Sequence, residues 1–99
     1  MTERNKKTIE NIKLLKEKGF SFSYQMIANY MSDKNILRPN GMPYDREGVF
    51  NSLKSYYIDV EVEKAVNYML VALKKNNTRI WKYHRAVGRW PQKDIQKTR

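Results

Sequence analysis

The sequence predicts an all-α protein: a small helix-turn-helix domain of three helices, followed by a long amphipathic helix and a basic C-terminal helix. Three observations predict this fold. Residues 23–55 contain two short helical patterns joined by a connection rich in Gly and Pro. Residues 59–75 carry a long apolar stripe at helical spacing. A chain of 99 residues allows one small domain, or a compact domain with a tail.

The first helix is expected over residues 3–18, because Gly19 is a residue that commonly ends a helix. Its buried face is predicted to be an aliphatic stripe made of Ile9, Ile12 and Leu15. Two aromatic residues after the glycine, Phe20 and Phe22, are expected to enter the core.

The second helix is expected to begin after a cap at Ser21 or Ser23 and to last until about residue 32 or 33. Its apolar face contains a small residue, which favours close packing; the face consists of Ile27, Ala28 and Met31. The connection that follows, residues 38–43, contains Gly41 and two prolines. Met42 and Tyr44 flank Pro43 there, so this turn could hold a short extended pair or lie against the core, and the sequence leaves both open.

Asp45 is placed to cap the third helix. On a helical wheel one arc is apolar and consists of Val49, Phe50, Leu53, Tyr56 and Tyr57. The remaining residues are expected to face outward: Glu47, Gly48, Asn51, Lys54 and Ser55.

This outward face suits DNA recognition, since Asn can pair with adenine and Lys can reach guanine or phosphate. Arg46 near the helix start could contact phosphate or a base edge, and Gly48 would allow a close backbone approach. An ordinary solvated helix face has the same composition and remains an alternative.

The segment also resembles the helix-turn-helix part of the DNA-binding domain of large serine recombinases. The resemblance covers about a third of the chain and rests on Ile27-Ala28, Asp33-Lys34-Asn35-Ile36, Asn40-Gly41, Tyr44, and Val49 with Leu53. Asn35 stands where that family favours Gly, and nothing in the chain resembles the family's catalytic domain. The resemblance therefore implies a DNA-binding module and no recombinase activity.

The fourth helix is expected from about residue 59 to residue 75. Asp59, Glu61 and Glu63 lie in its first turn, where helix capping explains them better than a metal or acid/base site. Its apolar stripe is expected partly to cover the core and partly to form a two-fold dimer contact through Val62, Val66, Met69, Leu70 and Leu73.

A basic stretch at residues 78–91 is predicted to form the last helix, with Thr78 as its cap. One arc is apolar and consists of Ile80, Tyr83, Val87 and Trp90. The other is basic and is expected to follow a phosphate backbone. Trp81 and His84 fall outside both arcs. They could be a partly buried aromatic and a solvated histidine, or side chains that stack on a base or sugar. Residues 92–99 are expected to be a frayed basic tail.

The predicted DNA-binding residues are Arg38, Arg46, Glu47, Asn51, Lys54, Ser55, Arg79, Lys82, Arg85 and Arg89. The predicted division of the chain is a helix-turn-helix core at residues 1–57, a packing and basic-helix region at 58–91, and a tail at 92–99.

Charge and residue types limit the classes of function. The net charge of +10 favours a polyanionic partner, although a solubilising surface has the same signature. There is no Cys and a single His, so no catalytic centre, metal site or cofactor is expected. No apolar run approaches the length of a membrane span, and the chain is expected to be cytoplasmic.

These observations together predict a dimeric protein that binds specific double-stranded DNA. Its expected role is that of a regulator or accessory factor of a phage, plasmid or other mobile element. Two other classes remain open. The protein could act on a protein partner through the apolar helix at residues 62–73, or bind RNA or single-stranded nucleic acid through its Trp, Tyr and Arg residues.

Overall fold

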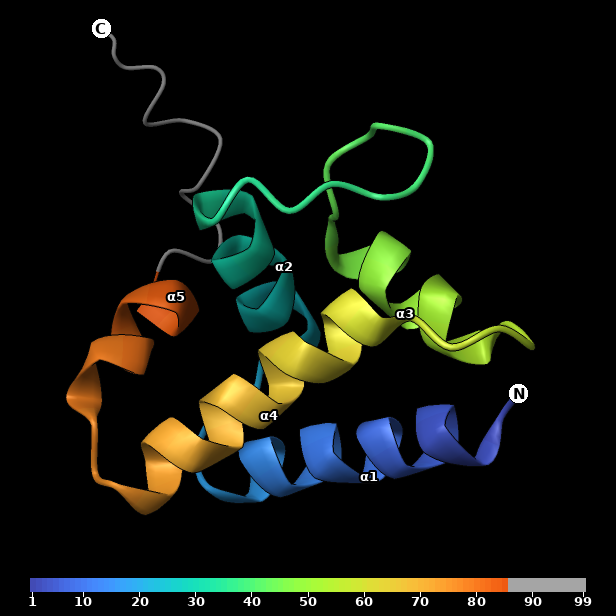
Figure 1. Ribbon diagram of the computed structural model, residues 1–99. Helices are drawn as coiled ribbons and strands as arrows, with labels where there is room; N and C mark the ends of the chain where they lie inside the picture. Colours follow the sequence, from blue (N-terminus) through green and yellow to red (C-terminus); the bar gives the residue numbers. More distant parts are fainter. Residues whose placement is uncertain (86–99) are drawn as a thin grey trace, which may run out of the picture.

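The computed structural model describes residues 1–85, and every regular element in this range is a helix (Figure 1). The elements are α1 (Glu3–Glu17), α2 (Ser23–Asp33), α3 (Arg46–Lys54), α4 (Val60–Lys74), the 3-10 turn η1 (Thr78–Ile80) and α5 (Trp81–Arg85). The all-α prediction is confirmed. The predictions for Val87, Arg89, Trp90 and the tail at 92–99 lie outside the described residues.

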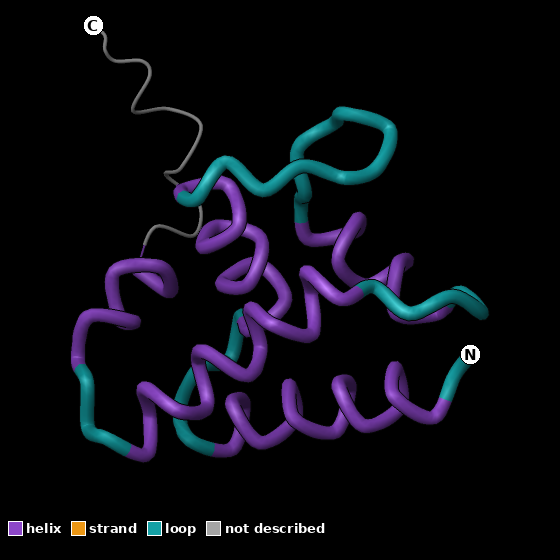
Figure 2. The backbone as a smooth tube through the Cα atoms, viewed as in Figure 1, coloured by secondary structure: helices purple, strands orange, loops and turns teal. Residues whose placement is uncertain are grey.

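Helices α1 and α4 run side by side in the same direction (Figures 1 and 2). At their beginnings Arg4 forms an ion pair with Glu63 and donates from Nε to Oε2 at 3.2 Å. Near their ends Leu14 lies close to Leu70 and Leu73. The two helices thereby form one layer, on which α2 packs.

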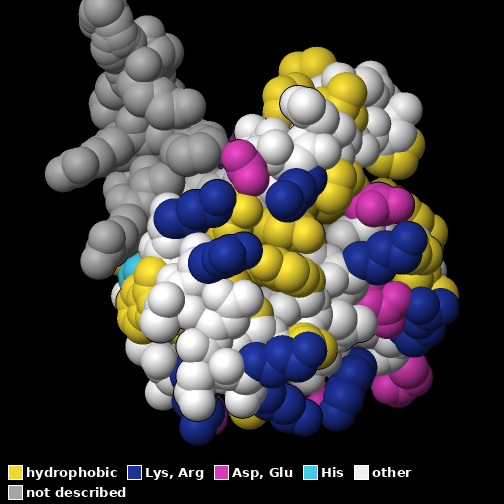
Figure 3. All heavy atoms as spheres, turned by 60° about the vertical axis from the view of Figure 1, so that its left-hand side comes forward, with side chains coloured by type: hydrophobic (Ala, Val, Ile, Leu, Met, Phe, Trp, Pro, Cys, Tyr) yellow, Lys and Arg dark blue, Asp and Glu magenta, His cyan; other side chains and the backbone are white. Residues whose placement is uncertain are grey.

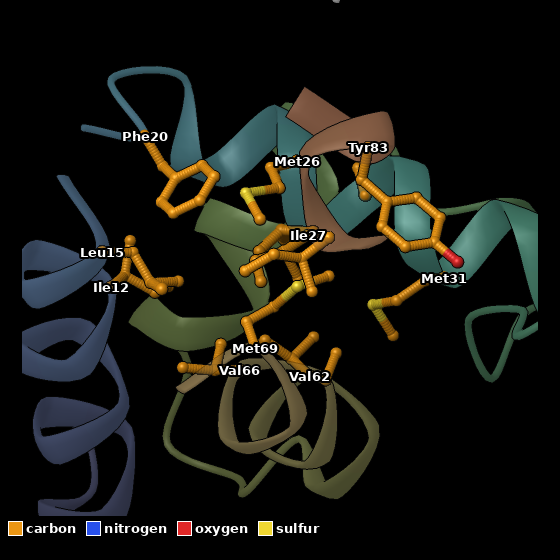
Figure 4. Packing of buried hydrophobic residues seen from close by; sticks show 14 of the residues in the cluster. Ile12, Leu15, Phe20, Met26, Ile27, Met31, Val62, Val66, Met69 and Tyr83 are labelled. Carbon is orange, nitrogen blue, oxygen red and sulfur yellow. The ribbon is translucent and has the colours of Figure 1, made fainter. Parts of the chain in front are cut away.

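The core is built around α2 (Figure 4). The predicted apolar face of α2 is fully buried: Ile27, Ala28 and Met31 are at most 1% exposed. It meets Ile12 and Leu15 from α1, both of which are also fully buried. Because α4 and α5 contribute residues to the same cluster, residues 1–85 share a single core.

The turn between α1 and α2 differs in part from the prediction. Gly19 ends α1 with a φ of +108°, and Phe20 is buried as expected. Phe22, however, is 55% exposed, because it occupies the N-cap position of α2 and lies outside the core. Neither predicted serine caps α2. Instead, the ring Nε2 of His84 accepts a hydrogen bond from the Phe22 backbone N–H at 3.2 Å.

The connection between α2 and α3 contains a small hairpin at residues 37–43. Leu37 and Pro43 form an isolated antiparallel bridge. The turn therefore holds a short extended pair, one of the two alternatives that the sequence left open, and residues 37 and 43 close it. Tyr44, beyond this pair, lies against the core and is only 5% exposed. The connection begins at Asn35, whose φ of +57° is left-handed. Asn tolerates this conformation better than most side chains do.

Helix α3 is shorter than the predicted apolar arc requires. Asp45 caps it as expected, with Oδ1 accepting from the Gly48 N–H at 2.6 Å. The helix ends at Lys54, so Tyr56 and Tyr57 are not on its inner face and are 88% and 52% exposed. Their assignment to the core was wrong.

Phe50 was also placed in the core and is 42% exposed, because it lies at the edge of the buried arc and packs on Tyr24. Asp59 caps α4 as predicted and accepts from the Val62 N–H at 3.1 Å. Within residues 1–85, no helix has the length and apolar character needed to cross a membrane.

Candidate nucleic-acid interface

Helix α3 presents a polar face to solvent. Val49 and Leu53 fix its orientation, because both are fully buried against the core. Three of the predicted DNA-binding residues, Glu47, Asn51 and Lys54, are exposed and share one arc of the helix away from Val49 and Leu53, since successive residues turn by about 100°. Arg46 is also exposed, but it is the first residue of α3 and lies about 140° from Asn51 around the helix axis.

Gly48 does not lie on this outward face. It is buried, because the guanidinium of Arg38 covers it. A Cβ at position 48 would lie 2.5 Å from Nη2 of Arg38, so the arginine can occupy this place only above a glycine. The expectation that Gly48 faces outward was wrong, and its small size serves contact within the protein.

Arg38 joins the hairpin to α3. Its Nη2 donates to Oδ1 of Asp45 at 3.1 Å, and its Nε donates to the Pro43 carbonyl at 3.2 Å. The same Asp45 oxygen caps α3, so a single carboxylate oxygen serves both the helix and the arginine. Arg38 is therefore occupied in holding the hairpin on α3, although it was predicted to contact DNA.

Ser55, the last predicted residue of this face, is half-buried at the end of α3. Its hydroxyl donates to the carbonyl of Ser52 at 2.8 Å and closes the helix end. A shallow cavity of about 340 Å³ lies between the hairpin and α3, and both Asn51 and Ser55 line it. The cavity is bounded on the hairpin side by Arg38, Pro39 and Asn40.

Lys54 lies beside an exposed aromatic ring. Its Nζ is 5.2 Å from the ring centroid of Phe50, which in turn meets Tyr24 edge to face at 5.4 Å. A cation held near an aromatic face loses part of its conformational freedom before it meets any ligand. The contact therefore orients the lysine on the exposed face of α3.

The second group of predicted DNA-binding residues lies elsewhere. Arg79 and Lys82 are exposed at the α5 end of the molecule, and α2 separates this end from α3 (Figure 1). Arg85 is the last residue of α5, and Arg89 lies outside the described residues. The structure therefore does not place the two basic groups on one continuous surface.

The α5 end carries an aromatic cluster that sequence reasoning did not anticipate. The rings of Tyr30 and Tyr68 stack at 4.9 Å, and Tyr83 meets Tyr30 edge to face at 5.3 Å. The surrounding face shows hydrophobic side chains between Lys and Arg side chains (Figure 3). Because Tyr83 comes from α5, Tyr30 from α2 and Tyr68 from α4, no single helical pattern could reveal the cluster.

Hydrogen bonds fix Tyr83 in this cluster. Its hydroxyl donates to Asp33 Oδ2 at 3.0 Å, and its backbone carbonyl accepts from Asn29 Nδ2 at 2.7 Å. Burial, together with the hydrogen bond to Asp33, raises the pKa of Tyr83 above its ordinary value. Tyr83 is therefore a structural residue that docks α5.

The predicted dimer stripe on α4 is largely used within the molecule. Val62, Val66 and Met69 are fully buried in the core and cannot contact a partner, so their assignment to a dimer surface was wrong. Leu70 and Leu73 are only partly buried. With exposed apolar residues from both helices, Leu14 and Val71, they line a groove of about 330 Å³ between α1 and α4.

Among residues 1–85, no three His, Cys, Asp or Glu residues are grouped so that they could hold a metal ion. Searches against protein-family models, curated proteins and solved structures found no match to this chain.

Proposed function

We propose that the protein binds double-stranded DNA, with α3 as the helix that enters the major groove. The observation that carries this proposal is the exposed face of α3, where Asn51 and Lys54 lie together and Arg46 is exposed at the helix start, beside a hairpin that Arg38 fixes to α3. A net charge of +10 supplies the general attraction to phosphate. The resemblance of residues 27–53 to a recombinase DNA-binding module also supports it.

The residues of this face would have different roles in binding DNA. Asn51 is suited to bidentate pairing with adenine, because its amide offers a donor and an acceptor at an exposed position. Lys54 would reach guanine or phosphate, and Arg46 in the first turn would contact phosphate. Arg38 and Ser55 would act as positioning residues, because Nε and Nη2 of Arg38 and the Ser55 hydroxyl are hydrogen-bonded within the protein.

The biological role that best fits such a module is that of a regulator or accessory factor of a mobile element, acting in transcription, excision, replication or partition. A dimer would place two copies of α3 over adjacent half-sites about one DNA turn apart. Since Val62, Val66 and Met69 are buried, the dimer contact would use the groove between α1 and α4, which includes Leu70 and Leu73.

The first test is selection from a random duplex library and from the same library as single strands, at two salt concentrations. The proposal expects enrichment of a short duplex motif that persists at the higher salt concentration. Retention that ignores strandedness and disappears at higher salt would contradict it, because charge alone would then explain binding.

A pair of asparagine variants sharpens this test. Asn51→Ala should relax specificity at one base position and cost about 1–3 kcal/mol of binding to the selected duplex. Asn67→Ala removes the same amide from an exposed position on α4, outside α3, and should leave binding unchanged. Equal effects of the two substitutions would contradict a reading role for α3.

The groove between α1 and α4 favours a second candidate function, in which the protein acts on a protein partner. Val71 is 50% exposed there and Leu14 is 46% exposed, side by side on two rigid helices. In that case Val71→Asp would abolish function in the cell while Asn51→Ala would leave it intact. If DNA binding is the function, Asn51→Ala should impair it in the cell.

A further inference from the structure

The hairpin at residues 37–43 has a defined backbone. The Arg38 N–H donates to the Met42 carbonyl at 2.8 Å, and the Gly41 N–H donates to the Arg38 carbonyl at 2.8 Å. Gly41 has a φ of +87°, which lets the chain reverse without strain. The side-chain oxygen of Asn40 accepts from the Met42 N–H at 3.0 Å. The hairpin is thus held by its own hydrogen bonds.

The hairpin is also fixed relative to α3. The Arg38 side chain lies over Gly48 and is bonded to both Asp45 and Pro43, so it links the hairpin base to the first turn of the helix. A ligand that orients α3 would consequently orient the hairpin as well. The two elements act as one rigid unit.

Apolar side chains project from this rigid hairpin into solvent. Leu37 is 52% exposed and Met42 is 57% exposed, so neither side chain is buried in the core. The loop projects from the top of the molecule and shows hydrophobic atoms on its surface (Figure 3). Residues 34–44 include Lys34 and Arg38 and no acidic residue. An exposed apolar tip without negative charge suits a partner that is anionic outside and apolar within.

The minor groove of DNA is such a partner. It is about 6 Å wide, too narrow for a helix but open to a thin backbone segment. Proteins that bind it often insert Leu, Met or Pro between base steps and bend the duplex. We propose that the 37–43 hairpin enters the minor groove next to the major groove occupied by α3, with Leu37 and Met42 as wedges. This inference rests on the proposed binding of α3 to duplex DNA.

The test uses the full chain and the duplex motif enriched by the library selection, with a fluorophore at each end. Wild-type protein should shorten the end-to-end distance seen by energy transfer, and netropsin, which occupies the minor groove, should compete with binding. The double variant Leu37→Ala/Met42→Ala should lose at least half of the distance change and bind about tenfold more weakly, because two apolar contacts are removed.

A matched control is Phe22→Ala, which truncates a similarly exposed apolar residue, 55% exposed and beside His84 at the α5 end. It should bend the duplex like the wild type. Thermal unfolding of each variant excludes misfolding as the cause. If the wild type binds the duplex but neither bends it nor competes with netropsin, the proposal that the hairpin enters the minor groove is wrong, and the proposed function stands. If the wild type does not bind duplex DNA at all, the proposed function itself fails.

Discussion

Gly48 shows how a single missing side chain can shape a binding surface. Ala at this position would be favoured over Gly within a helix by roughly 0.5–1 kcal/mol. It would also displace the Arg38 guanidinium, the far end of a flexible side chain, which can move at small cost. We therefore expect Gly48→Ala to change the free energy of unfolding by less than about 1 kcal/mol while it loosens the hairpin.

Hydrogen exchange measures that loosening. The backbone amides of Arg38 and Gly41, which are bonded within the hairpin, should exchange faster in Gly48→Ala than in the wild type. Arg38→Ala, which removes the guanidinium without adding a Cβ, should produce the same loss of protection. Unchanged exchange in both variants would show that the arginine does not hold the hairpin.

Asn35 gives a second prediction at this scale, because its φ of +57° is costly for most side chains. Asn35→Val should destabilise the protein by about 1–2 kcal/mol, and Asn35→Gly should leave stability unchanged or slightly raised. Urea unfolding checks both. The control, Asn67→Val, makes the same replacement at an exposed helical position and should cost only a few tenths of a kcal/mol.

Residue roles that depend on local chain geometry were predictable from the sequence. The caps at Asp45 and Asp59 and the stop at Gly19 follow from neighbouring residues alone, and the structure confirms them. The position of Arg38 over Gly48 was not predictable, because it depends on how a ten-residue stretch folds back on the next helix. Leu37 and Met42 could have been noticed as apolar residues in a turn.

At the scale of elements, α5 is docked by polar contacts as well as by its apolar residues. Tyr83 donates to Asp33, its carbonyl accepts from Asn29, and His84 accepts from the N–H of Phe22, the residue before α2. Because burial and the Asp33 hydrogen bond raise the pKa of Tyr83, its neutral form is favoured in the folded state. Its contribution to stability is therefore complete below the ordinary tyrosine pKa of 10.0 and is lost as the pH rises above that value.

Tyr44, whose hydroxyl donates to Asp59 at 2.7 Å, has its pKa raised for the same reasons and adds to the effect. Denaturant unfolding between about pH 8 and pH 11 should show stability falling above about pH 10. Tyr83→Phe should be less stable at pH 8 by about 1 kcal/mol, because the hydrogen bond is gone, and should decline less steeply. A decline as steep as that of the wild type would rule out Tyr83 as a source of the pH dependence.

The helices themselves were predictable because their apolar residues repeat with the helical period. The surfaces against which these helices pack were not predictable. The stripe on α4 was correctly expected to be apolar, yet periodicity cannot tell whether Val62, Val66 and Met69 face the chain's own core or a second copy. The arc on α3 was extended to Tyr56 and Tyr57 because the sequence does not mark the end of the helix at Lys54.

At the scale of the whole molecule, the basic residues predicted to bind DNA fall in two groups, one at α3 and one at the α5 end, with α2 between these helices (Figure 1). The sequence predicted that both groups hold one duplex. Arg79 and Lys82 lie at the α5 end, away from α3, so a short duplex bound to α3 should not reach them.

The salt dependence of binding separates these possibilities. Each neutralised phosphate contributes roughly 0.9 to the slope of log affinity against log salt. For a duplex of about two turns, Arg46→Ala/Lys54→Ala should reduce that slope by about two, whereas Arg79→Ala/Lys82→Ala should leave it unchanged. Equal reductions would mean that the duplex wraps around α2 to touch both ends. A reduction only for the α5 pair would move the DNA-binding face from α3 to the tyrosine-rich surface beside α5.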